Sequence, residues 1–125
     1  HLKQLERELP SNIQLSIYRI VQELVNNTMK HSGASKITLR IAIEDDEALQ
    51  MYYADDGKGF DMEKVESQPG GLGLKNMLMR ASVMDGFITF FSKPGAGMRV
   101  ELRVPGITSP HKARKLEFRP DRLQM

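Results

Sequence analysis

Four short segments of the chain carry apolar side chains at every second position, and this alternation restricts the folds that are open to it. The pattern runs through residues 36–43 and 48–55 and again through residues 87–91 and 98–104. Successive side chains of a strand point to opposite faces, so each segment is predicted to be a strand with one buried side. Because a polar turn at 44–47 separates the first pair and a turn at 94–97 separates the second, we expect two hairpins, at 36–55 and 87–104.

Two further segments have the period of a helix. Residues 12–31 carry an apolar stripe at spacings of three and four, and residues 72–85 resume that spacing. Gly33 is expected to end the first helix in a left-handed conformation. Helices and hairpins in this order predict an α/β fold, a two-layer sandwich in which helices cover one face of a mixed, mostly antiparallel sheet. The stripe of the first helix consists of Ile13, Ile17, Ile20, Leu24 and Thr28.

A polar row flanks this apolar stripe. Glu23, Asn27 and His31 are four residues apart, so in a helix they lie on the same side, one turn above another. A carboxylate and an amide beside a core-facing stripe are expected to be partly buried and therefore to need partners. An ordinary amphipathic helix with polar residues at its rim gives the same pattern, and the helix alone does not decide between the two.

Asp55 continues the inward-facing row of the second strand. A carboxylate in such a row is costly unless a donor faces it. The alternative is a strand-end aspartate that caps the following turn through backbone N–H groups, and the alternation alone favours this alternative. Gly57 and Gly59 follow at once, and such glycines let the backbone turn sharply and approach a flat ligand closely.

A second pair of glycines, Gly71 and Gly73, precedes or opens the second helix. The unpaired N–H groups of a helix N-terminus suit phosphate, although an isolated Gly-x-Gly is more often only a turn. The polar residues 60–70 before it lack a period and are expected to form a short mobile lid. Two other phosphate motifs are absent, because no P-loop sequence occurs and a dinucleotide fingerprint would need glycine at Met62 or Asn76.

Composition excludes several classes of protein. The 125 residues suffice for one domain with a proper core, and no apolar run approaches the length of a membrane span. Without cysteine the chain forms no disulfide and no thiolate metal site, which fits a cytoplasmic protein. The formal net charge of +2 is small, and its excess lies mostly after Ser109, so no nucleic-acid partner is expected.

Three motifs in order carry a resemblance to a known family. Through them, Leu9–Pro105 resembles the ATP-binding catalytic domain of bacterial sensor histidine kinases, within the group that shares a Bergerat-type fold with DNA gyrase, the Hsp90 chaperones and the MutL proteins. The subgroup it resembles most is that of kinases acting on response regulators with LuxR-type DNA-binding domains. The motifs are Glu23-x-x-x-Asn27, Asp55-Asp-Gly57-Lys-Gly59 and Gly71-Leu-Gly73-Leu-Lys-Asn76-Met77.

The resemblance implies a role for each matching residue. Asn27 would coordinate Mg²⁺ on the ATP phosphates, and Glu23 would order a water of the metal or the attacking group. Asp55 would accept a hydrogen bond from the exocyclic amine of adenine. For His31, a structural role and a phosphate contact are both open. Glu23 and Asn27 form the implied catalytic pair. The implied nucleotide-binding residues are Asn27, Lys30, His31, Asp55, Gly57, Gly59, Gly71, Leu72, Gly73, Leu74 and Asn76.

One position departs from the pattern of the family. A threonine usually follows the last glycine pair and lines the phosphate region, but Met98 stands there in this chain. One hydroxyl contact of the family site is therefore expected to be missing.

The resemblance also implies a reaction and partners. The γ-phosphoryl group of ATP would pass to a histidine on a separate dimerisation domain and then to an aspartate of a response regulator. None of His1, His31 and His111 is assigned as the acceptor, so this chain is expected to bind ATP without phosphorylating itself, and to be monomeric alone. Two alternatives remain open: an anti-sigma-factor-type serine kinase or regulator, and a degenerate domain that binds partners but no nucleotide.

The chain divides into three expected parts. Residues 1–10 are charged and form the edge of the domain or a linker, and residues 11–106 form the catalytic domain. Residues 107–125 are basic, lie outside the resemblance and are expected to be a flexible tail rather than a nucleic-acid arm.

Overall fold

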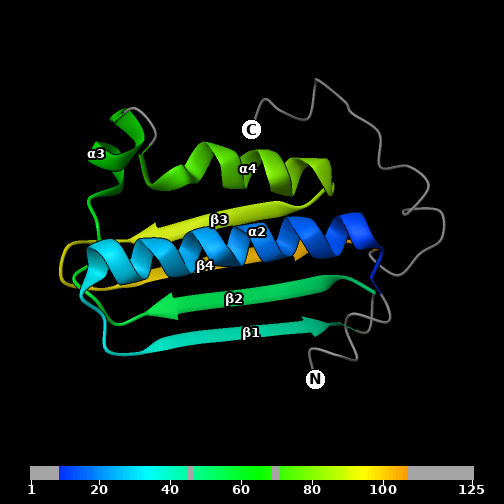
Figure 1. The fold of residues 1–125 in the computed structure, drawn as a ribbon, viewed down its shortest axis with the longest axis horizontal. Coiled ribbons are helices and arrows are strands. Elements are labelled where there is room, and N and C mark those ends of the chain that lie inside the picture. Colours follow the sequence, from blue (N-terminus) through cyan, green and yellow to red (C-terminus); the bar gives the residue numbers. More distant parts are fainter. Residues whose placement is uncertain (1–8, 45–46, 69–70, 107–125) are drawn as a thin grey trace.

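The structure is a computed structural model that describes residues 9–44, 47–68 and 71–106. Four strands form one sheet in the order β1-β2-β4-β3 (Figure 1). Both predicted hairpins are present, and antiparallel pairing of β2 with β4 joins them. No parallel pair occurs among the described strands, so this sheet is antiparallel throughout where a mixed one was expected. The strands are β1 (Ile37–Ile43), β2 (Leu49–Asp55), β3 (Phe87–Ser92) and β4 (Met98–Val104).

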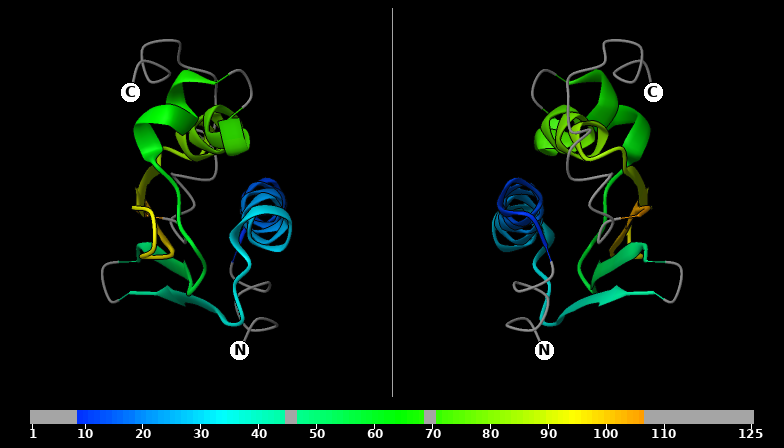
Figure 2. Two further views of the ribbon diagram at one scale, coloured as in Figure 1. Left: turned by 90° about the vertical axis from the view of Figure 1, so that its left-hand side faces the viewer. Right: turned by 90° about the vertical axis from the view of Figure 1, so that its right-hand side faces the viewer.

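Two helices cover one face of the sheet (Figure 2). They are α2, Ser11–Asn27, and α4, Leu74–Val83. The first continues into a short π-helix, η1 (Thr28–Ser32), and Gly33 follows with φ +63°, as predicted for its end. A 3₁₀ turn, η2 (Gly71–Gly73), leads into α4. The predicted two-layer α/β fold is therefore confirmed.

The hydrophobic core fills the space between these helices and the sheet. The stripe of α2 supplies Ile13, Ile17, Ile20 and Leu24, each at most 6% exposed. Full burial of each such side chain contributes about 1.5–3 kcal/mol. The packing of these layers fixes where the polar ends of α2 and β2 come to lie. From the other elements the core includes Met51, Tyr53, Met77, Ala81, Ile88, Val100, Leu102 and Val104.

The first strand is less buried than its alternation predicted. Ile37 and Leu39 are each 38% exposed, although they lie on the face that the helices cover. Leu39 pairs with the fully buried Tyr53 of the next strand. Among the described strands β1 has only one neighbour, so its side chains are covered from one side alone. The pattern identified the correct face but not how completely the face is covered.

The segment expected to be an irregular lid contains a helix, α3 (Met62–Ser67). Asp61 caps it, because its Oδ1 accepts hydrogen bonds from the backbone N–H groups of Glu63 at 3.2 Å and Lys64 at 3.5 Å. Val65 is its single buried residue. A helix of six residues is too short to display a period, which explains why the sequence pattern missed it.

Two further observations bear on the predicted division of the chain. The predicted tail, 107–125, and most of the predicted linker lie outside the described residues. Within the described parts, no helix has both the length and the apolar character needed to cross a membrane.

Candidate functional site

The polar row of α2 meets the glycine pair that precedes α4. Asn27 is 5% exposed, and its Nδ2 donates a hydrogen bond of 2.7 Å to the backbone carbonyl of Leu72. Leu72 lies between Gly71 and Gly73 and has the left-handed φ of +53°. Two of the three motifs, 45 residues apart in the chain, are thus joined by a direct contact.

The carboxylate of Glu23 lies against the second of these glycines. A Cβ atom added to Gly73 would collide with Oε1 of Glu23 and would lie 2.8 Å from its Cδ. Gly73 also has φ +69° and directly precedes α4. Glycine is therefore required here both for its backbone conformation and for space. The close approach of Glu23 to Gly73 places its carboxylate at the N-terminal end of α4.

Asp55 is buried and is held from two sides. Its Oδ2 accepts a hydrogen bond of 2.9 Å from the hydroxyl of Thr28, and its Oδ1 accepts one of 2.9 Å from the backbone N–H of Gly57. Asp55 therefore caps the turn and also faces a donor from η1. Sequence reasoning missed Thr28 as a polar partner, because its spacing places it in the apolar stripe.

The turn after β2 is closely packed. A Cβ atom on Gly57 would lie 2.5 Å from the carbonyl oxygen of Ser32, and one on Gly59 would collide with the carbonyl of Lys93. Both predicted glycines thus have a packing role in the fold, independent of any contact with a ligand. The neighbouring Asp56 is exposed, and its carboxylate accepts hydrogen bonds from Ser35 and from the backbone N–H of Lys36.

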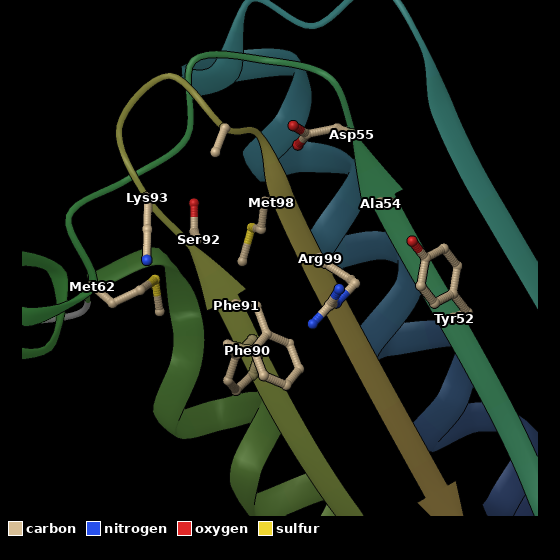
Figure 3. Close-up of a pocket in the computed structure, with 11 residues that line it drawn as sticks. Tyr52, Ala54, Asp55, Met62, Phe90, Phe91, Ser92, Lys93, Met98 and Arg99 are labelled. Atoms are coloured by element: carbon tan, nitrogen blue, oxygen red, sulfur yellow. The ribbon is translucent and has the colours of Figure 1, made fainter.

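A hollow of about 660 Å³ lies at this end of the sheet, and Asp55 forms part of its wall (Figure 3). Met98, the residue that replaces the threonine of the family, is the direct β4 partner of Asp55 and lines the same hollow. Phe91 and Arg99 also line it, although alternation places them on the uncovered face of the sheet, so the hollow opens onto that face.

A second hollow, of about 520 Å³, lies beside α3 and the start of α4. Phe90 lines both hollows, so they are neighbours. Four residues predicted to bind phosphate lie in the wall of the second: Gly71, Gly73, Leu74 and Asn76. Asp55 and the glycine pair before α4 thus border two different hollows that share Phe90.

Lys30 and His31 lie on η1 and are exposed. Within the described part of the chain the side chain of neither residue makes a hydrogen bond or ion pair. Residues five apart are linked in a π-helix, so the buried residue one turn beyond Asn27 is Ser32 rather than His31. The expected row of three polar side chains thus extends only from Glu23 to Asn27.

The donor atoms present fit a magnesium ion bound together with phosphates. Mg²⁺ binds proteins through one or two oxygen ligands and completes its shell with substrate phosphates and water. Since Nδ2 of Asn27 is bound to Leu72, the amide oxygen is the atom available to a cation, and the carboxylate of Glu23 stands one turn earlier. The described residues contain no group of three or more His, Asp or Glu side chains that would hold a metal alone.

Comparison with protein families and curated proteins gives consistent matches. Residues 12–107 match the family described as histidine kinase-, DNA gyrase B-, and HSP90-like ATPase. The sensor protein VraS of Staphylococcus epidermidis is 35% identical over 98 residues, which cover 78% of this chain and 27% of that protein. VraS of Staphylococcus aureus is 36% identical over 99 residues, with coverage of 78% and 27%. The chain thus spans about a quarter of the length of these relatives.

Solved structures share the fold. The histidine kinase domain of the blue-light activated histidine kinase from Erythrobacter litoralis superposes with a TM-score of 0.69 at 19% identity, over 88% of this chain and 51% of that one. A longer structure of the same kinase gives a TM-score of 0.68, over 82% and 33%. At this identity the likeness concerns the fold alone.

Proposed function

Since the chain belongs to the histidine kinase-, DNA gyrase B- and HSP90-like ATPase family, we propose that it is the ATP-binding catalytic domain of a two-component sensor histidine kinase. The observation that carries the proposal is the contact of Asn27 with Leu72, with Glu23 placed against Gly73. It brings an amide and a carboxylate to the helix N-terminus that would receive the phosphates.

Base recognition falls to Asp55. An ionised carboxylate only accepts hydrogen bonds, and the exocyclic amine of adenine is a donor. The burial of Asp55 and its position in the wall of the 660 Å³ hollow support this role. The apolar side chains of Met98 and Phe90 line the same hollow and offer surfaces for a flat ring.

Phosphate binding falls to the residues around η2 and the first turn of α4. Backbone N–H groups at a helix N-terminus point outward without partners and favour negative charge. Asn27 and Glu23 would hold Mg²⁺, the former through its amide oxygen and the latter through water. The ion would neutralise the charge of the phosphates. Lys30 and His31 add positive charge or donors on the adjacent turn.

The reaction is proposed to be phosphoryl transfer to an imidazole. A nitrogen of the acceptor histidine forms a bond to the γ-phosphorus, the bond from that phosphorus to the bridging oxygen breaks, and ADP leaves. Because no histidine of this chain is assigned as acceptor, the acceptor belongs to a separate dimerisation domain. A response regulator, of the type with a LuxR-like DNA-binding domain, then receives the group. The domain is proposed to be cytoplasmic and monomeric alone.

Calorimetric titration with ATP and Mg²⁺ tests the nucleotide site. Wild type is expected to bind ATP, and Asp55→Asn to lose most of this binding because an amide presents a donor to the adenine amine. Asp56→Asn is the matched control, since it makes the same change one residue away on the opposite face. Absence of ATP binding by the wild type would overturn the proposal. If Asp55→Asn binds ATP as tightly as Asp56→Asn does, the adenine base lies elsewhere.

Chemical stability of the product tests the acceptor. Full-length protein incubated with labelled ATP is expected to give phosphate that is lost in acid and retained in base, as for phosphohistidine. Label that survives acid would favour the serine kinase instead. This chain alone is expected to take up no label.

A further inference from the structure

We propose that Thr28 and Tyr53 are positioning residues that orient the Asp55 carboxylate and thereby set the preference of the site for adenine over guanine. The inference rests on the proposed function, because it concerns the same nucleotide site. It assigns a role to two residues that none of the three motifs contains.

The two hydroxyl groups and the carboxylate form one buried chain. Tyr53 Oη lies 2.6 Å from Thr28 Oγ1, which lies 2.9 Å from Asp55 Oδ2. Thr28 is 3% exposed and Tyr53 is fully buried. A hydroxyl group has one hydrogen, and an ionised carboxylate can only accept, so Thr28 donates to Asp55. Tyr53 must then be the donor in the shorter bond.

Tyr53 controls the direction in which the Thr28 hydroxyl points. A threonine in a helix can instead donate to the carbonyl four residues earlier, which here is that of Leu24. The Tyr53 hydroxyl is also within donating distance of that carbonyl oxygen, at 3.3 Å, but its one hydrogen is assigned to the much shorter contact of 2.6 Å with Thr28. By occupying the acceptor side of the threonine hydroxyl, Tyr53 leaves its hydrogen directed at Asp55.

Tyr53 stays protonated, and so remains a donor, well beyond neutral pH. Burial raises the pKa of its phenol above the ordinary 10.0, and the nearby Asp55 charge raises it further, while the hydrogen bond with Thr28 acts in the opposite direction. The chain of bonds is therefore intact under physiological conditions.

The carboxylate is fixed on both oxygens, yet it retains sites for a ligand. Thr28 binds Oδ2 and Gly57 binds Oδ1, which uses two of about four lone-pair sites. Those that remain can only accept. Adenine presents an amine to such a group, whereas guanine presents a carbonyl oxygen at the same ring position. Two acceptors that face each other in a buried site leave both unpaired, which is costly.

No other side chain duplicates the Thr28 hydroxyl. Among the described residues Thr28 supplies the single side-chain hydrogen bond to Asp55. Met98, directly across the β2–β4 ladder, has no hydroxyl to offer. Loss of Thr28 would therefore leave Asp55 held by Gly57 alone.

The test compares the dissociation constants of ATP and GTP, both with Mg²⁺. Thr28→Val, which keeps the shape but removes the hydroxyl, is expected to weaken ATP binding about tenfold and GTP binding less, since hydrogen bonds to charged groups are the stronger ones. The ratio of the GTP dissociation constant to the ATP dissociation constant should therefore fall nearly tenfold. Thr28→Ser should restore the ratio, and Tyr53→Phe should lower it by a smaller factor.

Thr89→Val is the matched control, because it makes the same change at an exposed position of β3, and its ratio should equal that of wild type. A melting temperature lowered in Thr28→Val with an unchanged ratio would make Thr28 merely structural and overturn the inference. If Thr28→Val does not fold, an unchanged ratio in Tyr53→Phe overturns it instead. Equal wild-type affinity for ATP and GTP would also overturn it, whereas no binding of either nucleotide would refute the proposed function itself.

Discussion

The side-chain amide of Asn27 and the backbone carbonyl of Leu72 are joined by a hydrogen bond of 2.7 Å, which ties the end of α2 to the kink that precedes α4. The partner is a backbone atom, so the bond depends on the conformation of the kink rather than on the leucine side chain. The same amide thus contributes to the fold through its nitrogen and, in the proposed site, to cation binding through its oxygen.

Asn27→Asp is expected to disrupt this bond. The change replaces the donor with an acceptor that faces the Leu72 carbonyl, and a buried polar atom left unpaired costs about 1–3 kcal/mol. The free energy of unfolding from urea denaturation should fall by that amount. The exposed neighbour Asn26 provides the control, because Asn26→Asp makes the same change without burial. Equal stability of the two variants would contradict the assigned bond.

Gly73→Ala is expected to destabilise the protein more than the same change at Gly33. Both glycines have nearly the same left-handed backbone, with φ +69° and φ +63°, so an alanine pays the same conformational cost of about 1 kcal/mol at each. A Cβ at position 33 meets no atom within 4 Å, whereas one at position 73 collides with Glu23. Unfolding free energies measure the difference, and Glu23→Ala should reduce it. A difference near zero would refute the close approach of Glu23.

Asp56 is expected to make the protein sensitive to acid. Its pKa is lowered by the hydrogen bond from the Lys36 backbone first and then by those from Ser35, at 2.8–2.9 Å. A lowered pKa favours the folded state above the unfolded value of about 3.8, and this contribution disappears as the pH falls through the folded pKa. The urea midpoint of Asp56→Asn should therefore depend less on pH below 3.8 than that of wild type. If the urea midpoints of wild type and Asp56→Asn changed with pH in the same way, the lowered pKa of Asp56 would be contradicted.

Tyr53 is expected to make the protein sensitive to base. Its raised pKa means that the unfolded chain loses the phenolic proton first, so stability is complete below pH 10.0 and falls as the pH rises toward the folded pKa. Alkaline urea titrations should show a smaller fall for Tyr53→Phe than for wild type. Tyr18→Phe, at a residue 61% exposed, should show the wild-type slope. A common slope for all three proteins would be evidence against the buried phenol.

The strands and the glycine-bearing turn before α4 were predictable from local sequence pattern. The contacts between residues far apart in the sequence were not. Alternation located the four strands of the described residues, and the glycine spacing located the turn before α4. The exposure of Ile37 depends on the position of β1 at the edge of the sheet, which no local period records. The role of Thr28 depends on Tyr53 and Asp55, which lie on a strand at least 25 residues away. The direction of the Thr28 hydroxyl depends on these partners, so it is defined only in the folded protein.

The kink at Leu72 also has a consequence for sequence variation. A leucine held at φ +53° costs about 1–2 kcal/mol in backbone conformation, and β-branched residues tolerate this region least of all. In a library of random substitutions, position 72 should therefore accept glycine or asparagine and reject valine and isoleucine. Most apolar positions tolerate other apolar residues better than polar ones. Position 72 should do the opposite, because its left-handed backbone, and not the volume of its side chain, limits which residues fit.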